Sequence, residues 1–393
     1  MKKLLLASAA TALMAGAASA QDVKLGVLLG FTGPLESITP AMGAGADLAI
    51  KEVNDSGKFT LGTVSAVRGD STCIDAAAAT AAAERLVTAD GVTAIVGGDC
   101  SGVTGAVLQN VARPNGIGMI SPSATSPALS TAEDDGLFFR TAPSDARQGE
   151  IMADILTEKG IKSVALTYTN NDYGKGLADS FGAAFAAKGG TVTISAPHED
   201  GKADYSAEVA SLASAGGEML VVAGYVDQGG KGVIQASLDS GAFSTFYLVD
   251  GMYGDALIEA IGEPLNGSFG AVPGTDSEGA TKYQEMATAA GFDGTSAFSP
   301  ESYDAAALIL MSMAAANSTA SKDWTTKVMD LANAPGEPIL PGELGKALEL
   351  IAAGTDIDYI GATAVELVDA GESAGNYREY SITDGAITTV GFR

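Results

Sequence analysis

The stretch Val23–Leu29, with the sequence VKLGVLL, decides the fold of this chain. Apart from Lys24 and Gly26 every residue in it is apolar, and the run has the length of a single strand. A glycine-rich loop follows, and then a helical pattern over 40–54. Strands that are apolar on both faces are typical of parallel sheets covered by helices. The stretch therefore predicts the first strand of an α/β fold.

The same alternation continues along the chain and starts again after a boundary near 140–143. The first set comprises predicted strands at 63–67, 93–96 and 118–120 and predicted helices at 75–89 and 101–113. The second set comprises predicted strands at 163–167, 191–194, 219–222 and 246–249 and predicted helices at 173–188, 204–214 and 228–240. Helical patterns then follow at 277–290, 300–316 and 323–333. We therefore expect two doubly wound parallel-sheet lobes, with the last helices returning to the first lobe.

The first twenty residues have the features of a secretory signal peptide. Two lysines precede an apolar segment over 4–18, and the sequence ASA at 18–20 places small residues before a cleavage site. A membrane anchor is the alternative, but the segment is short for a membrane span. No cysteine follows directly, which argues against a lipoprotein. We expect a cleaved signal peptide over 1–20 and a periplasmic protein.

Composition narrows the classes of partner. The chain has 22 basic and 48 acidic residues and a formal net charge of −26, so nucleic acid and anionic lipid surfaces would repel it. Its 393 residues, 46% of them hydrophobic, are enough for two cores. The longest later apolar run, 305–316, is too short for a membrane span and predicts a buried helix. The composition therefore argues against nucleic acid and anionic membranes as partners.

Cys73 and Cys100 are the only two cysteines. In an oxidising compartment an isolated pair is typical of one disulfide. Closing a loop of about 28 residues would stabilise the fold by roughly 3.5 kcal/mol in the chain-entropy account. Two free buried thiols or half of a metal site are the alternatives. The single histidine, His198, is distant in sequence, so we predict a disulfide and no metal.

Open parallel sheets bind ligands beyond the carboxyl ends of their strands. That rule selects the loops 30–37, 97–102 and 121–127 in the first lobe, and Tyr225 with Asp250 in the second. Ser101 opens a predicted helix, where it can cap the helix and where neighbouring amides can bind an anion. A purely structural cap is the more common role of such a serine. These loops are the candidate ligand-binding segments of the chain.

These residues together resemble the type I periplasmic binding proteins of ABC importers, in particular the leucine/isoleucine/valine-binding branch. The segments that carry the resemblance are 27–34 (VLLGFTGP), Cys100-Ser101 with Cys73, 121–127 (SPSATSP), 171–176 (NDYGKG) and Gly224-Tyr225. The resemblance covers essentially the whole mature chain. It implies a monomer without a cofactor, with two α/β lobes joined by a three-segment hinge. The implied lobes are residues 21–141 plus 271–375 and residues 142–270 plus 376–393.

The resemblance also implies a ligand site. Its residues would be Ser101, Ser123, Ala124, Thr125, Tyr173, Tyr225, Asp250 and Phe298. The hydroxyls of Ser101, Ser123 and Thr125 would bind the carboxylate of an amino acid, and Tyr225 with Asp250 would bind its ammonium. Tyr173 and Phe298 would line the cleft. Pairing both charges of a zwitterion is necessary because an unpaired buried charge costs several kcal/mol.

Two departures from that branch bear on the ligand. The ammonium partner there is a glutamate, whereas this chain has Asp250, which is one methylene shorter. The loop 35–37 would close over the ligand's side chain, and Glu36 stands near the place where the branch often carries an aromatic residue. A charged Glu36 would favour a ligand that is more polar or larger than leucine. Amides or urea and aromatic carboxylic acids are alternative ligands, although Asp250 argues against a plain aromatic acid.

The sequence argues against an enzyme. His198 lies in a polar context over 196–201 and is expected at the surface, and no Gly-x-Ser-x-Gly elbow accompanies it. Metal-ligand clusters, phosphate-binding glycine loops and dinucleotide-binding glycine motifs are also absent from the sequence. The expected partners are a small ligand and the permease and ATPase complex of an ABC importer. A periplasmic sensor subunit with the same fold is the alternative.

Overall fold

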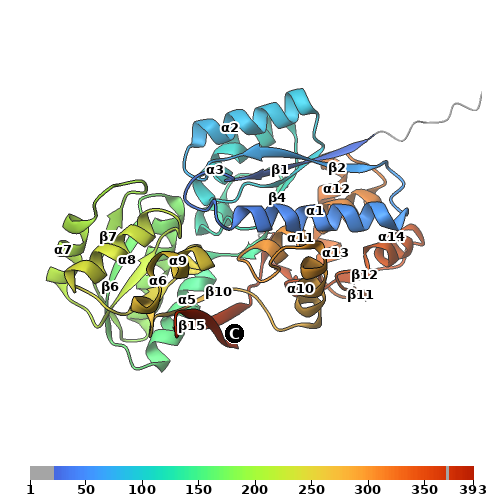
Figure 1. Ribbon diagram of the computed structural model, residues 1–393. Helices are drawn as coiled ribbons and strands as arrows, with labels where there is room; N and C mark the ends of the chain where they lie inside the picture. The colour runs from blue at the N-terminus through green and yellow to red at the C-terminus, as the bar shows by residue number, and fades with distance from the viewer. Residues whose placement is uncertain (1–21, 369–370) are drawn as a thin grey trace, which may run out of the picture.

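Among the described residues, two seven-stranded sheets form the centres of two lobes that lie side by side (Figure 1). The computed structural model describes residues 22–368 and 371–393. The predicted signal peptide lies outside the described residues. Both lobes are α/β layers in which helices cover a mainly parallel sheet, as the apolar strands predicted.

The first lobe is built on a sheet with the strand order β13-β14-β5-β4-β3-β1-β2. Its strands are β1 (Val23–Leu29), β2 (Val64–Asp70), β3 (Ala94–Gly97), β4 (Met119–Ser121), β5 (Phe138–Pro143), β13 (Leu367–Val368) and β14 (Glu372–Ser373). Neighbouring strands are parallel except for β13 with β14. A separate parallel pair is formed by β11 (Glu337–Ile339) and β12 (Ile357–Tyr359).

The second lobe has the strand order β16-β15-β10-β9-β8-β6-β7. Its strands are β6 (Ser163–Thr169), β7 (Thr191–His198), β8 (Met219–Ala223), β9 (Phe246–Leu248), β10 (Phe269–Pro273), β15 (Tyr377–Thr383) and β16 (Ala386–Phe392). β15 pairs antiparallel with both β16 and β10 at one edge, and the remaining pairs are parallel. This strand order therefore mixes an antiparallel edge with a parallel body.

Helices surround both sheets (Figure 1). Those of the first lobe are α1 (Thr39–Ser56), α2 (Ala76–Arg85), α3 (Ser101–Val107), α4 (Arg113–Asn115), α10 (Glu278–Ala290), α11 (Ser299–Ala316), α12 (Ser321–Trp324), α13 (Val328–Ala332) and α14 (Leu344–Ala352). Those of the second lobe are α5 (Asp145–Glu158), α6 (Asp172–Ala187), α7 (Ser206–Ala215), α8 (Gly229–Ser240) and α9 (Asp255–Ile261). Short π and 3-10 segments are η1 (Leu86–Asp90), η2 (Leu108–Ala112), η3 (Pro127–Thr131), η4 (Asp250–Met252), η5 (Glu263–Leu265) and η6 (Thr325–Lys327).

The chain crosses between the lobes at three places. It passes from β5 to α5, from β10 to α10, and from β14 to β15. The expected lobe boundaries at 141/142 and 270/271 fall inside β5 and β10, which continue to Pro143 and Pro273. These two crossings therefore begin two and three residues after the boundaries that the resemblance implied.

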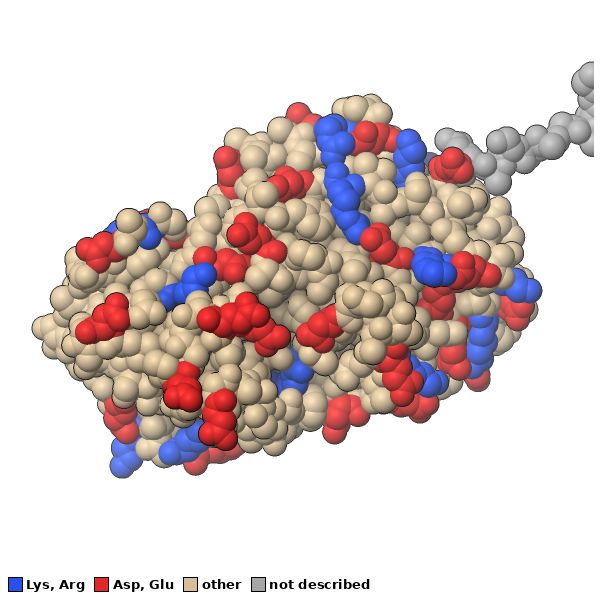
Figure 2. Space-filling view, in the orientation of Figure 1, with Lys and Arg blue, Asp and Glu red and all other residues tan. Residues whose placement is uncertain are grey.

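The last helices do return to the first lobe. The apolar run predicted as a buried helix lies in α11, whose residues from Ala305 to Met313 are buried. Gly45 lets α1 approach α11 closely, since a Cβ there would lie 2.4 Å from the Ser299 carbonyl oxygen. Among the described residues no helix combines the length and apolar character that crossing a membrane requires. Acidic side chains are scattered over both lobes on the face in Figure 2 and outnumber basic ones.

Candidate ligand-binding site

A small cavity lies between the lobes, beyond the carboxyl ends of strands from both sheets. It is lined by Leu35, Asp99, Cys100, Ser101, Ser123, Tyr173, Tyr225, Asp250, Gly251 and Phe298. Its empty volume is about 250 Å³, of which only about 10 Å³ can hold the centre of a water-sized sphere. This is room for about one water molecule. The two lobes are therefore closed over the site, with polar groups of both in its walls.

Ser101 presents a hydroxyl proton from the first lobe. It lies at the start of α3, and its Oγ accepts hydrogen bonds from the amides of Thr125 at 3.2 Å and Ser126 at 3.0 Å. Because both bonds use the oxygen as acceptor, the hydroxyl proton is free to donate to a ligand. The expected helix cap is not formed, since Cys100 occupies the cap position without a side-chain bond. Ser101 instead joins α3 to the 121–127 loop.

Ser123 has the opposite polarity. Its hydroxyl donates to the carbonyl oxygen of Asp99 at 3.0 Å, which leaves the oxygen lone pairs of Ser123 for other contacts. In this arrangement the hydroxyl accepts from a ligand rather than donating to one. The two serines of this wall therefore suit different ligand groups.

Asp99 adds a buried carboxylate to the same wall. It is 1% exposed, and its oxygens accept bonds from the amide of Gly30 at 2.7 Å and the hydroxyl of Ser71 at 2.6 Å. Burial raises the pKa of the Asp99 carboxyl, and the two donors oppose that rise. Asp99 was not among the site residues expected from the sequence, although it lies two residues after the apolar strand β3.

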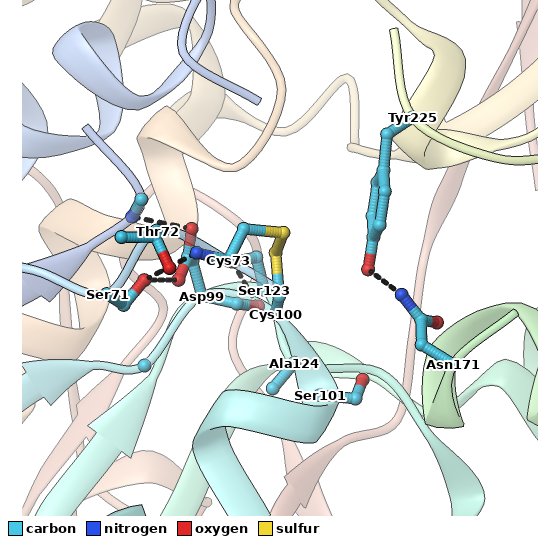
Figure 3. Close-up of a disulfide and its surroundings, with 12 residues drawn as sticks. Ser71, Thr72, Cys73, Asp99, Cys100, Ser101, Ser123, Ala124, Asn171 and Tyr225 are labelled. Atoms are coloured by element: carbon cyan, nitrogen blue, oxygen red, sulfur yellow. Dashed lines mark hydrogen bonds between the residues drawn. A yellow bond between two sulfur atoms is a disulfide. The ribbon is translucent and has the colours of Figure 1, made fainter. Parts of the chain in front are cut away.

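A disulfide holds this wall together. Cys73 and Cys100 are bonded, with their Cα atoms 5.1 Å apart, and so the predicted disulfide is confirmed. Figure 3 shows it between Asp99 and the aromatic ring of Tyr225. The two cysteines and Asp99 are also the one group of potential metal ligands among the described residues. Bonded sulfurs offer no thiolate, so this group does not fit a metal ion.

The second lobe supplies Asp250 and a pair of aromatic rings. Asp250 follows β9, is 1% exposed, and accepts a 2.6 Å bond from the Tyr173 hydroxyl at the start of α6. The rings of Tyr173 and Tyr225 stack with their centroids 5.2 Å apart. The side chain of Asn171 donates to the Tyr225 hydroxyl at 3.3 Å, as Figure 3 shows. The side chains of Tyr173, Tyr225 and Asn171 thus fix the position of the Asp250 carboxylate.

A second group of buried polar side chains lies beside Asp250. Asp145 and Gln148, both fully buried in α5, have no hydrogen-bond partner of good geometry for their side chains among the described residues. The same holds for the hydroxyls of Thr125 and Tyr377. Asp145 nevertheless ties the lobes together, because its amide donates to the Thr125 carbonyl oxygen at 2.8 Å. Sequence reasoning missed this group, which no local motif signals.

Asp145 and Asp250 influence each other's protonation. Burial, and then the like charge of Asp250, raise the pKa of Asp145 well above its ordinary value. Burial also raises the pKa of Asp250, but the hydrogen bond from Tyr173 and the neighbouring Gln148 side chain act against that rise. The better-bonded carboxyl is the one that ionises first. We therefore assign the negative charge of the pair to Asp250 and the proton to Asp145.

Comparison with known proteins identifies the family. The family described as periplasmic binding protein matches residues 22–336. The chain belongs to this family. It is 35% identical over 244 residues to Leu/Ile/Val-binding protein homolog 3 of Brucella melitensis biotype 1, an alignment that covers 58% of this chain and 62% of the relative. It is 30% identical over 389 residues to the chemotactic signal transduction system substrate-binding protein BasB of Halobacterium salinarum, which covers 94% of this chain and 89% of the relative.

A solved structure agrees in fold. The branched-chain amino acid transporter substrate binding protein LivJ of Streptococcus pneumoniae, in complex with isoleucine, superposes with a TM-score of 0.77 at 23% identity. The superposition covers 94% of this chain and 99% of that chain. The resemblance to the leucine/isoleucine/valine-binding branch is confirmed. The expectation of a binding protein rather than an enzyme is confirmed by the same relatives.

This periplasmic binding protein brings six of the eight expected site residues to the cavity wall. They are Ser101, Ser123, Tyr173, Tyr225, Asp250 and Phe298. Thr125 and Ala124 are buried but do not line the cavity. Thr125 contributes its backbone to Ser101 and Asp145 instead. Leu35 lines the cavity where Glu36 was expected to matter, and Glu36 is exposed to solvent.

The expectation that His198 lies at the surface is wrong. His198 is the last residue of β7 and is 1% exposed. Its Nδ1 lies 2.8 Å from the Thr167 hydroxyl. Tyr205 meets the ring edge-on at a centroid distance of 6.4 Å. Burial lowers the pKa of His198 to about 4. The polar residues that follow it in sequence suggested a loop, but β7 extends to His198 and carries it into the core.

Proposed function

We propose that this periplasmic binding protein is the solute-binding component of an ABC import system, which captures a small amino acid, branched-chain or related, and delivers it to a membrane permease. The observation that carries the proposal is the opposed chemistry of the cavity walls. Ser101 offers a hydroxyl proton from the first lobe, and Asp250 offers a carboxylate from the second. An amino acid has groups that match both.

The physical argument rests on pairing of charge. A zwitterion that leaves water needs a partner for each charge, because an unpaired buried charge costs several kcal/mol. Asp250 is suited to the ammonium. For the carboxylate, the Ser101 hydroxyl is joined by the first amides of α3, which precede the first bond within that helix, donated by Thr104 to Cys100.

The remaining cavity wall favours a small apolar side chain. Leu35 and Phe298 are apolar and nearly fully buried, and the stacked rings of Tyr173 and Tyr225 extend the same surface. Opening and closing of the lobes about the three crossings would admit the ligand. We infer that the two lobes consist of the residue ranges expected from the sequence. The exceptions are the first two boundaries, which follow the ends of β5 and β10.

A second class of ligand is favoured by Asp99. Its buried carboxylate and the lone pairs of Ser123 stand on the wall assigned to the ligand's carboxylate. Groups that only accept would bind N–H donors, as in an amide or urea. The same two carboxylates, Asp99 and Asp250, disfavour an aromatic carboxylic acid. Amides and urea are therefore the principal alternative.

A thermal-shift screen distinguishes these classes. The panel contains leucine, isoleucine and valine, then acetamide and urea, then benzoate. A ligand at a hundred times its dissociation constant stabilises the protein by about 2.7 kcal/mol. We expect stabilisation by one or more amino acids. Stabilisation by acetamide or urea alone, or by benzoate alone, would contradict the proposal and assign the other class.

The partner of the closed protein also needs a test. The Halobacterium relative is named for chemotactic signal transduction, which keeps a periplasmic sensor as the second candidate function. A permease and an ATPase encoded beside this chain would support import. A membrane receptor gene in their place would support sensing. Export by the signal peptide over 1–20, and a monomeric state without cofactor or metal, are parts of the same proposal.

A further inference from the structure

A second hollow, larger than the ligand cavity, lies where the lobes meet near the crossings. About 360 Å³ of it can hold the centre of a water-sized sphere, compared with about 10 Å³ of the ligand cavity. The first lobe contributes residues around the start of α10 and α11, and the second contributes β15 and β16. Phe298 lines both this hollow and the ligand cavity. The hollow is therefore adjacent to the ligand site, and one aromatic residue is common to both.

Arg378 of β15 gives this hollow its charge. Of the seven arginines it is the one without a carboxylate of the described residues at ion-pair distance. Its guanidinium lies 4.7 Å from the centre of the Tyr253 ring and donates one bond, to the Thr295 carbonyl oxygen at 3.1 Å. Its Nε is buried and unpaired. Most of the five N–H donors of this arginine are thus uncommitted.

The rest of the wall is uncharged. The hollow's lining includes the hydroxyls of Thr275 and Ser296 and the amide of Gln284, and no carboxylate among the described residues lines it. Asp293, which is close in sequence, accepts both bonds of Thr295 at 2.8 Å. Glu301, which is near Arg378, is fully buried below the surface, and burial raises its pKa to about 8. An unpaired cation therefore faces neutral donors in a chain whose net charge is −26.

We propose that this hollow binds a small oxyanion, a carboxylate or a phosphate, through Arg378 with Ser296, Gln284 and Thr275. A planar guanidinium with free N–H groups matches two oxygens of such an anion. The cation–π contact with Tyr253 and the bond to the Thr295 carbonyl oxygen hold the guanidinium in place. Since residues of both lobes line the hollow, a bound anion contacts both lobes and favours the closed arrangement. This site is separate from the proposed amino-acid site and stands without it.

The test measures thermal stability of the whole mature protein against sodium phosphate and sodium succinate. Sodium chloride at equal ionic strength is the reference, so that the effect of ionic strength on the melting temperature is subtracted. We expect a saturable rise in melting temperature with phosphate, succinate or both, and the two series identify which anion is preferred. Arg378→Gln should weaken this binding roughly tenfold or more, because it removes hydrogen bonds to a charged group.

Two variants make the result specific. Arg85→Gln removes the same charge from an ion pair on α2, far from the hollow, and should leave anion binding unchanged. Arg378→Lys keeps the charge and serves if Arg378→Gln does not fold, as judged by circular dichroism; it should bind more weakly than wild type. The proposal is overturned if neither anion gives a saturable shift. It is also overturned if the substitutions at Arg378 leave the shift unchanged.

Discussion

The hydroxyl of Tyr173 donates a 2.6 Å hydrogen bond to Oδ1 of Asp250, and both residues line the cavity between the lobes. Asp250 follows β9, and Tyr173 comes from the first turn of α6, so two elements of the second lobe fix this carboxylate. The tyrosine also stacks on Tyr225. A carboxylate held in this way has one oxygen committed to the protein and the other available to a cation.

Tyr173→Phe should weaken ligand binding while keeping the ring stack. The change removes the only donor that the Tyr173 side chain has, and leaves Asp250 with fewer bonds to its charged form. A bond to a charged group contributes roughly 1.5–3 kcal/mol, so we expect an affinity loss of that order. Calorimetry with the ligand identified by the screen measures it. Tyr168→Phe, in β6 and outside the cavity wall, is the control and should bind like wild type.

Ligand affinity should fall as the pH is lowered. Burial raises the pKa of Asp250, whereas a bound ammonium would lower it, so binding an amino acid releases protons. Affinity then rises with pH until Asp250 is ionised in the free protein, and is constant above that point. The titratable groups that interact with it are Asp145, Tyr173, Tyr225, Tyr247, Tyr377 and Tyr380.

Calorimetry in two buffers of different ionisation enthalpy measures the proton release directly. In Asp145→Asn a neutral amide replaces the protonated carboxyl of Asp145, so any proton release that remains on binding belongs to Asp250. An affinity that stays constant, or rises, as the pH falls would rule out an ionised Asp250 as the ammonium partner.

His198 should make the fold less stable in acid. Burial lowers its pKa from 6.5 to about 4, so between these values the unfolded chain binds a proton that the folded chain does not. Stability therefore rises with pH across this window and is lost as the pH falls. The shift corresponds to about 3 kcal/mol. Urea unfolding of wild type and His198→Asn at pH 7 and pH 4 should show that their difference in stability shrinks by about this amount.

Wild type and His198→Asn have to be compared because buried Glu301 changes the stability of the fold with pH in the opposite direction. Burial raises its pKa to about 8, so the folded chain binds the additional proton and this contribution to stability is lost as the pH rises. Glu301 is common to both proteins and cancels in their difference. A difference between wild type and His198→Asn that is the same at both pH values would contradict the assignment.

The apolar strands could be read from the sequence because burial on both faces leaves a continuous signal. β1 and β8 were predicted within a residue of their ends. β5 was read as a boundary, because its sequence FFRTAP contains an arginine and ends in proline. Arg140 is buried there because it pairs with Glu372 at 2.5 Å, 232 positions away, and donates to the carbonyl oxygens of Ala124 and Ser126. No local pattern reveals such a partner.

The site residues also fall into those that could be predicted from the sequence and those that could not. Ser101 and Asp250 were found because they follow strands at the carboxyl edge of a sheet. Asp145 and Gln148 were missed because their role depends on the approach of the two lobes, which brings the Thr125 carbonyl to the Asp145 amide. A phosphate-binding or metal-binding motif can be recognised from the sequence alone. A single buried carboxylate such as Asp99 is recognised as a site residue only when its surroundings are known.

The most direct test of the central claim is calorimetry of Asp250→Asn with an amino-acid ligand from the screen. Asp255→Asn, an exposed acid at the start of α9, is the matched control, and circular dichroism checks that both variants fold. We predict that Asp250→Asn loses roughly 2–5 kcal/mol of binding free energy, since the ammonium would be buried without its counter-ion. Asp255→Asn should bind like wild type. If Asp250→Asn binds the amino acid as tightly as wild type, Asp250 is not the ammonium partner and the amino-acid site proposed between the lobes is wrong.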